Sequence, residues 1–267
     1  MKIRAILFIA FFLVNAALYI FSSEVRGIVI QSLSLVDPVG AALVGLIAAT
    51  VYGINSANGR AMMLVAAGIG CWGIGEIIFM VFANIMNIDP FPSIADVFFL
   101  LAYPLLGVGI YLGFAAAEVK LAQVKKSLLA ILLSASLVLT VLVVYFMLYQ
   151  VYDPEVDFAT NFVNISYGLG DLVLVILSFL AILVSNEYKG GKLGSFWKSM
   201  ALGLIMILIA DILFAIYNEQ ILNDIKPYTY VDLFWTAGYL FIAFGMLENY
   251  IHVRAVQKRV KLRVSQK

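Results

Sequence analysis

The chain has 267 residues, of which 64% are hydrophobic and 12% are charged, and its formal net charge is +1. With a mean hydropathy of +1.03, it has too little polar surface for a soluble globular protein of this length. These values predict a polytopic membrane protein. The single cysteine, Cys71, excludes an intramolecular disulfide.

Eight apolar runs are each long enough to cross a bilayer, because a hydrocarbon core of about 30 Å takes about 20 helical residues. In chain order they cover residues 3–21, 38–54, 61–86, 94–115, 127–148, 162–185, 196–217 and 230–251. The second run is short, and the stretch from Ser32 to Pro38 before it is a candidate extension. Lys2 and Arg4 precede the first run as in a signal peptide, but that run is long and no Ala-x-Ala cleavage site follows it. We therefore expect an all-α bundle of eight transmembrane helices.

The basic residues indicate the orientation, because lysine and arginine are retained on the cytoplasmic side. Of the 17 basic residues, only Arg26 and Lys226 fall in the loops of the opposite side. That side carries the acidic residues Glu24, Asp37, Asp89, Asp153, Glu155, Asp157, Glu219 and Asp224. We expect both termini in the cytoplasm and the protein in a prokaryotic plasma membrane. The basic tail, 252–267, is expected to bind anionic lipid and no nucleic acid.

The third and fourth runs resemble the seventh and eighth. Each pair has an acid three residues before a phenylalanine, at Glu76 and at Asp211. Each pair also has a tyrosine seven residues after an aspartate, and these are Asp96 with Tyr103 and Asp232 with Tyr239. The number of residues from Asp37 to Asp171 is similar to the number from Glu76 to Asp211. The pattern predicts an internal duplication.

The duplication sets the expected organisation of the single membrane domain. Repeat one covers residues 1–133 and holds four helices, repeat two covers 134–251 and holds the other four, and the tail 252–267 follows. Because four is an even number, both copies should have the same orientation, related by a pseudo-two-fold axis along the membrane normal.

Six carboxylates lie inside the expected spans. Glu248 stands near the inner end of the last span, and the other five have no lysine or arginine beside them, since Lys198 stands at the inner start of its span. An ionised acid in hydrocarbon costs roughly 2.5 to 3.5 kcal/mol, so these acids must be protonated, hydrogen-bonded, or turned toward water or a cation. Helix direction places all five in the outer half. We expect a ligand- or cation-binding site there, formed by Glu76, Asp96, Tyr103, Asp171, Asp211, Asp232 and Tyr239. The sequence assigns no catalytic residue and leaves metal binding open.

For these acids a structural role is the alternative to ligand binding. Asp96 and Asp232 stand where the N-caps of two helices are expected, with the backbone N–H groups free to bond to them. Glu76 and Asp211 lie mid-helix, where a protonated acid can bond across helices and hold them together. Asp171, close to Gly168 and Gly170, fits either role.

No cofactor is predicted. The pattern Gly68-x-Gly70-x-x-Gly73 lies inside a membrane span with no preceding strand, so it indicates helix packing and no dinucleotide site. His252 is the sole histidine, which excludes a multi-histidine zinc site. Retinal would need a lysine in mid-membrane, but Lys198 is at a helix start and Lys226 is in a loop.

A family resemblance appears in four sequence segments. They are Pro92-Ser93-x-Ala95-Asp96, Tyr167-Gly-Leu-Gly170-Asp171-Leu172, Ala210-Asp211 and Val231-Asp232-x-x-Trp235-x-x-Gly238-Tyr239. Together they resemble the multi-span membrane sensor modules that precede diguanylate cyclase, phosphodiesterase or histidine kinase domains in prokaryotes. The resemblance implies detection of an outer-side or intramembrane signal. Only a few helical turns follow His252, so we expect no output domain and a separate cytoplasmic signalling partner.

Three functions remain open from the sequence. The first is a sensory or ligand-binding module with an acidic pocket in the outer half. The second is a proton- or cation-coupled transporter. The third is an intramembrane lipid hydrolase that uses aspartates, suggested because Gly170-Asp171-Leu172 resembles an element of the lysoplasmalogenase family. The sequence favours a non-enzymatic role in the lipid bilayer.

Overall fold

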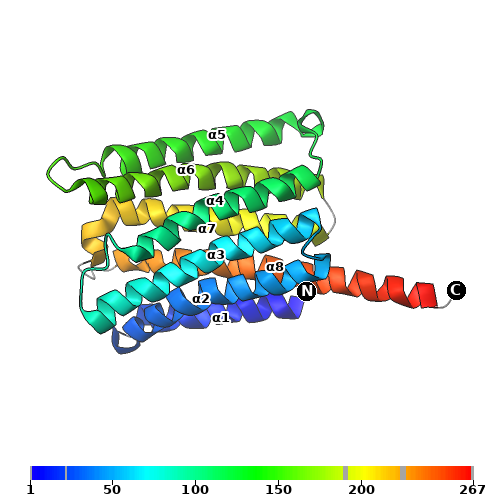
Figure 1. Ribbon diagram of the computed structural model, residues 1–267, viewed down its shortest axis with the longest axis horizontal. Coiled ribbons are helices and arrows are strands. Elements are labelled where there is room, and N and C mark those ends of the chain that lie inside the picture. The colour runs from blue at the N-terminus through cyan, green and yellow to red at the C-terminus, as the bar shows by residue number, and fades with distance from the viewer. Residues whose placement is uncertain (1, 22, 189–191, 223–226, 266–267) are drawn as a thin grey trace.

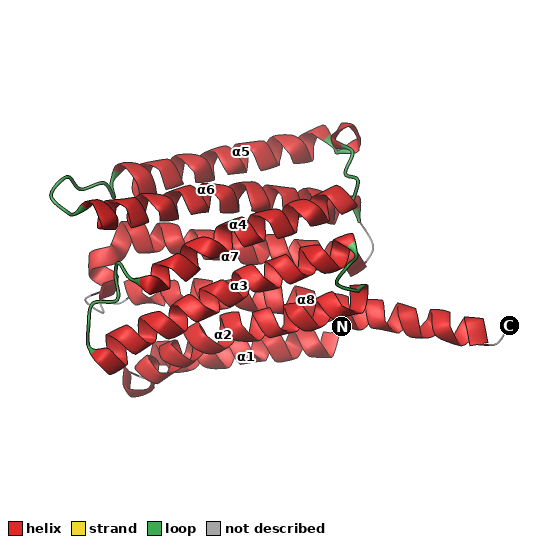
Figure 2. Cartoon of the chain, in the orientation of Figure 1, coloured by secondary structure: helices red, strands yellow, loops and turns green. Residues whose placement is uncertain are grey.

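The structure is a computed structural model that describes residues 2–21, 23–188, 192–222 and 227–265. In this part of the chain the regular secondary structure is entirely helical (Figure 2). The α-helices are α1 (Lys2–Phe21), α2 (Ser23–Tyr52), α3 (Ala57–Met80), α4 (Ile94–Ala116), α5 (Lys126–Val143), α6 (Phe158–Glu187), α7 (Lys192–Leu222) and α8 (Asp232–Ser265), as Figure 1 shows. Two π-helical segments, Val81–Met86 and Val144–Tyr149, continue α3 and α5, and Leu121–Gln123 and Tyr228–Val231 are 3-10 helical.

Seven helical segments within the described residues are long and apolar enough to cross a membrane. They are Leu35–Tyr52, Ala57–Ala83, Ile94–Ala116, Lys126–Tyr149, Phe158–Glu187, Gly194–Tyr217 and Tyr228–Arg263. The prediction of an all-α, multi-pass membrane protein is confirmed. The first predicted run forms α1, which is helical but is not among the seven, so membrane crossing by α1 stays a prediction.

The second helix is longer than predicted. It begins at Ser23, upstream of the expected start at residue 38, and continues through Pro38 to Tyr52. Proline is tolerated inside a membrane helix because neighbouring groups can satisfy the freed backbone carbonyl. As a result Asp37, which the sequence placed in a loop, is a buried residue of α2.

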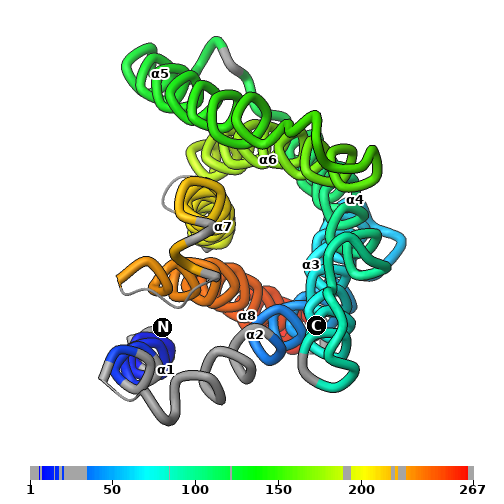
Figure 3. Tube along the Cα trace, turned by 90° about the vertical axis from the view of Figure 1, so that its left-hand side faces the viewer, coloured from blue at the N-terminus to red at the C-terminus, as the bar shows by residue number. Residues whose placement is uncertain are grey.

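Six helices surround the centre of the bundle, and α1 and α5 lie outside this ring (Figure 3). Helix α2 contacts α3 and α8, while α6 contacts α7 and α4. Helices α3 and α4 pack against each other, as do α7 and α8. Outside the ring, α1 packs on α2 and α8, and α5 packs on α6.

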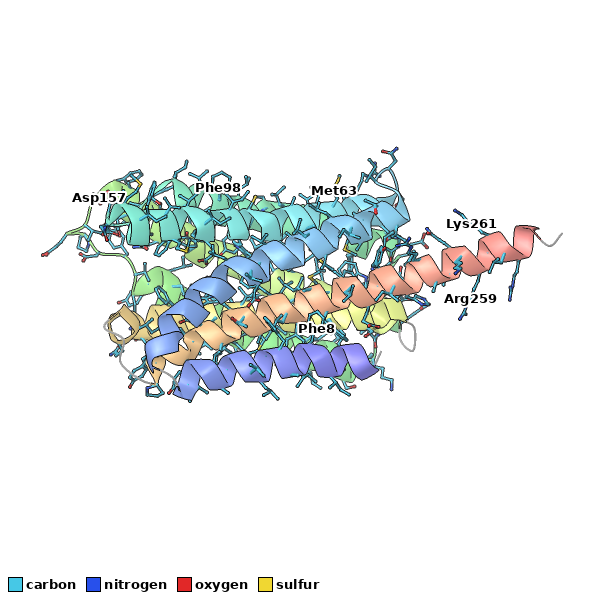
Figure 4. All side chains as sticks on the ribbon, turned by 90° about the horizontal axis from the view of Figure 1, so that it is seen from below. Phe8, Met63, Phe98, Asp157, Arg259 and Lys261 are labelled. Atoms are coloured by element: carbon cyan, nitrogen blue, oxygen red, sulfur yellow. The ribbon has the colours of Figure 1, made fainter. Side chains whose placement is uncertain are left out.

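The two ends of the bundle differ in charge. Helix α1 begins and α8 ends at one end, called here the basic end, which also carries Lys120 and Lys125 (Figure 1). The opposite or acidic end carries the loops with Asp89 and Asp153. Figure 4 labels Asp157 at the acidic end, and Arg259 and Lys261 at the basic end. That the basic end faces the cytoplasm stays a prediction.

Glycines allow the closest helix contacts in the ring. A Cβ added to Gly203 of α7 would lie 2.7 Å from the carbonyl oxygen of Gly238 of α8, and a Cβ on Gly238 would lie 2.9 Å from that of Gly203. In α3, a Cβ on Gly68 would lie 3.0 Å from the carbonyl oxygen of Ala102 in α4. Gly68 therefore serves helix packing, as its place in a membrane span predicts.

Aliphatic side chains fill the centre of the ring. Each of five helices contributes at least one that is 0% exposed: Ile69 from α3, Leu106 from α4, Leu174 from α6, Leu204 from α7, and Ile242 and Met246 from α8. The direction of each helix places these six residues closer to the basic end than the predicted acids. We call them the aliphatic layer.

Candidate functional site

Asp171 of α6 and Asp211 of α7 face each other at the contact between these two helices. The two carboxyl groups are within hydrogen-bonding reach of each other. The hydroxyl of Tyr103 donates a 3.2 Å hydrogen bond to Oδ1 of Asp171, and the indole Nε1 of Trp235 donates a 2.8 Å hydrogen bond to Oδ1 of Asp211. A hydrogen bond between two carboxyl groups requires a proton on one of them, because a carboxylate is only an acceptor.

Burial makes this pair unusual. Asp171 is 0% exposed, and no donor of the described residues reaches its second oxygen, Oδ2. The described side chains also give neither Asp171 nor Asp211 a lysine, arginine or histidine partner. A buried carboxylate without a partner is costly, so the pair is the strongest candidate for chemistry among the predicted acids.

Gly170 positions the tyrosine that bonds to the pair. A Cβ added to Gly170 would lie 2.5 Å from the ring of Tyr103, so the ring rests directly on the backbone of α6. This close approach brings the hydroxyl to the carboxyl of the next residue, Asp171. Gly170 therefore has a packing role, and that packing supports the site.

Asp96 belongs to a helix cap. Its Oδ2 accepts a 2.6 Å hydrogen bond from the backbone N–H of Ser93, and the Ser93 hydroxyl accepts a 3.1 Å bond from the backbone N–H of Ala95. Ser93 is thus the N-cap of α4, and Asp96 is the third residue of the helix, completing a capping box. The prediction that Asp96 is itself the N-cap is wrong. Its other oxygen, Oδ1, accepts a 2.6 Å bond from the hydroxyl of Tyr167 in α6.

Asp232 of α8 and Glu76 of α3 are two further acids of this region. Asp232 is the first residue of α8 and has helical backbone angles, because the 3-10 segment Tyr228–Val231 leads directly into the helix. The predicted N-cap role of Asp232 is therefore wrong as well. Glu76 is partly buried on α3 and lies within electrostatic range of Asp232, so the two negative charges repel each other when both are ionised.

Trp72 of α3 joins the two tyrosines of the predicted site. Its ring makes an edge contact with Tyr103 and another with Tyr239, with a centroid separation of 6.1 Å in both. Tyr239 in turn lies within electrostatic range of Glu76, Asp211 and Asp37. The predicted residues therefore occur in one region near the acidic end. Asp96 is held there by its cap, whereas Asp171, Asp211 and Tyr103 contact one another directly.

Four residues of this region were missing from the predicted site: Asp37, Trp72, Tyr167 and Trp235. Asp37 is 5% exposed, and its carboxyl accepts a hydrogen bond from the side chain of Thr236 in α8. The offset between Asp37 and Asp171 was the signal that could have identified it. Tyr167 is a polar residue expected at the same end as the acids, and both Tyr167 and Trp235 belong to the segments that resemble sensor modules.

The arrangement suits a proton better than a metal ion. In the described part of the chain, no group of three or more His, Cys, Asp or Glu side chains is placed to hold a metal. One proton supplies the donor that the facing carboxyls lack.

Comparison of the chain with protein-family models, curated proteins and solved structures gives no match. No family is therefore identified, and the resemblance to sensor modules stays a prediction. The chain is an integral, multi-pass helical membrane protein, and its role must be argued from the residues themselves.

Proposed function

We propose that this protein is a sensory membrane module that responds to protonation of Asp171 and Asp211. The observation that carries the proposal is the contact between these two carboxyls, with Asp171 fully buried and its Oδ2 without a donor. Two facing carboxylates repel each other, and one shared proton removes that repulsion. Loss of this proton pushes α6 and α7 apart, which is a two-state change that a signal can use.

The aliphatic layer supports sensing over transport. A transporter exposes its site to each side of the membrane in turn. Here Leu106, Leu174 and Leu204, each 0% exposed, fill the bundle between the acids and the basic end. The acids are therefore closer to the medium at the acidic end, as a detector of conditions on that side needs.

The burial of Asp171 also weighs against lipid hydrolysis. A catalytic aspartate must reach water and the bond that it cleaves. Asp171 is 0% exposed, and the hydroxyl of Tyr103 is bonded to it. We therefore assign no catalytic residue, and the site consists of Asp171, Asp211, Tyr103 and Trp235, with Glu76, Asp232 and Tyr239 beside it.

We further propose that the bundle is a duplicated four-helix unit, with α1–α4 in one copy and α5–α8 in the other. The helix contacts support this scheme: α2–α3 corresponds to α6–α7, α2–α8 to α6–α4, and α1–α2 to α5–α6. The copies then join between α4 and α5, upstream of the boundary expected at residue 133, which lies inside α5. In the same proposal both termini are cytoplasmic, the membrane is a prokaryotic plasma membrane, and a separate signalling partner binds at the basic end.

The proposal is tested by infrared spectroscopy of the protein in lipid nanodiscs during a pH titration. The wild type should show a carboxyl group that gains and loses a proton, and Asp171→Asn and Asp211→Asn should each abolish that signal. Glu155→Gln, in an exposed loop, serves as the control and should leave it unchanged. A wild-type spectrum in which no signal depends on Asp171 or Asp211 would overturn the proposal. Proton flux in sealed vesicles that stops in both variants would instead identify a transporter.

A further inference from the structure

We propose that Asp37 of α2 is a second proton-binding site, built with Thr236 and Tyr239 of α8. This inference rests on the proposed function, in which protonation of buried acids is the signal, and extends it. It assigns a role to a carboxyl outside the Asp171–Asp211 pair, on the opposite side of the helix ring.

The surroundings of Asp37 favour a protonated carboxyl group. Its side chain is 5% exposed and Oδ2 receives no hydrogen bond from the described residues, although the Thr236 hydroxyl donates to the carboxyl. Thr236 is itself 5% exposed. A single neutral donor does not balance a full negative charge inside a membrane, whereas a protonated carboxyl needs no counter-charge.

The charged groups around Asp37 are few. From α8, Tyr239 lies within electrostatic range of it, and Asp232 lies at the same end of the bundle. From α3, Glu76 lies at that end as well, where the charge of Asp232 acts on it. Among the described side chains, α1 presents no titratable group. Among the described side chains, the charged groups that these facing helices carry at this end are acids, which favours a bound proton over a bare carboxylate.

A second observation is the correspondence between the two sites. Asp171 of α6 bonds to Tyr103 of α4, and Asp37 of α2 lies in range of Tyr239 of α8. In the proposed duplication α2 corresponds to α6, and α4 corresponds to α8. Within the described residues, the buried carboxylate oxygens that lack a donor are those of Asp171 and Asp37, and they occupy matching places in the two proposed copies.

The sites differ in the partner of each carboxyl. Asp171 faces a second carboxyl, that of Asp211, whereas Asp37 faces the hydroxyl of Thr236. A shared proton between two acids and a proton on a single acid are released under different conditions, so the two sites should titrate in separate steps. Trp72, in contact with both Tyr103 and Tyr239, connects them.

The test is the same infrared titration in nanodiscs, applied to Asp37→Asn, Asp171→Asn and the double variant. We expect two carboxyl steps in the wild type, one in each single variant and none in the double variant. Thr236→Val should move the Asp37 step and leave the other, while Thr236→Ser, which keeps the hydroxyl, should leave both. These Thr236 variants retain Asp37 and so give a result even where Asp37→Asn fails to fold.

The outcomes separate the two proposals. If Asp37→Asn keeps both steps, or Thr236→Val moves neither, the second site is refuted while the Asp171–Asp211 site stands. If Asp171→Asn keeps both steps and Asp37→Asn removes one, the proposed function fails at its own site and the second site survives.

Discussion

The hydroxyl of Tyr103 donates a 3.2 Å hydrogen bond to the carboxyl of Asp171, 68 residues further along the chain. This bond joins α4 to α6, and with them the two proposed copies of the four-helix unit. Both residues are buried, so water does not replace the bond when it is removed. This bond and three neighbouring contacts can each be tested by substitution or by a change of pH.

Replacing Tyr103 by phenylalanine should destabilise the protein by about 1–3 kcal/mol, because the buried Oδ1 of Asp171 would lose the hydroxyl that donates to it. The free energy of unfolding is measured by denaturant titration in mixed micelles. Tyr111→Phe on the same helix is the control, since Tyr111 is 60% exposed and should tolerate the change. Equal stability of the two variants would show that the Tyr103 bond contributes little.

Gly170→Ala should lower stability by about 1–3 kcal/mol, because the new methyl group would meet the ring of Tyr103 at 2.5 Å and force it off the backbone of α6. Gly107→Ala in α4 is the matched control. Nothing lies within 4 Å of a Cβ at position 107, so that change should be neutral or stabilising. Thermal unfolding of the two variants side by side distinguishes a close helix contact from a general effect of alanine.

Ser93→Ala should cost about 0.5–2 kcal/mol, because Ser93 is the N-cap of α4 and accepts the backbone N–H of Ala95. Hydrogen exchange at the first turn of α4 should become faster, while exchange in α7 stays the same. Ser134→Ala, at an exposed position in the middle of α5, should change neither. A uniform increase across all helices would contradict a local capping role.

Acidification should fray the start of α6, because Asp157 stands directly before the membrane-spanning segment. Asp157 is its N-cap, and hydrogen bonds from the Thr160 side chain and backbone hold the pKa of Asp157 below its usual value of 3.8. A lowered pKa stabilises the folded form above the unfolded pKa, and this contribution is lost as the pH falls through the folded pKa. Exchange of the Ala159 and Thr160 amides should therefore be unaffected near neutral pH and rise only in strong acid.

The control for the acid effect is Asp157→Ser, which keeps a capping oxygen that does not titrate. Its exchange rates should show no such rise in acid. A rise of the same size in the wild type and in this variant would assign the fraying to another group.

The sequence predicted the helices and the region of the acids well, because apolar runs of this length form helices in a membrane and acids inside them gather away from lipid. It misplaced Asp37, since Pro38 is typical of a helix start although proline is tolerated within membrane helices. It misassigned Asp96, although Ser93 three residues earlier is the usual signature of a capping box. The hydrogen bond from Trp235 to Asp211 depends on how α7 and α8 cross at Gly203 and Gly238. That crossing geometry cannot be predicted from the sequence of either helix alone.

Helix α8 continues without interruption from Asp232 to Ser265 and leaves the bundle at the basic end (Figures 1 and 4). It is therefore one continuous, rigid helix that links the acidic region to the basic end. A rotation imposed at Tyr239 reaches Lys261, about 33 Å away at about 1.5 Å per residue, with its angle preserved, because the backbone hydrogen bonds resist torsion. In the proposed sensor, a rotation of α8 among the buried acids would therefore also turn the exposed final turns at the basic end.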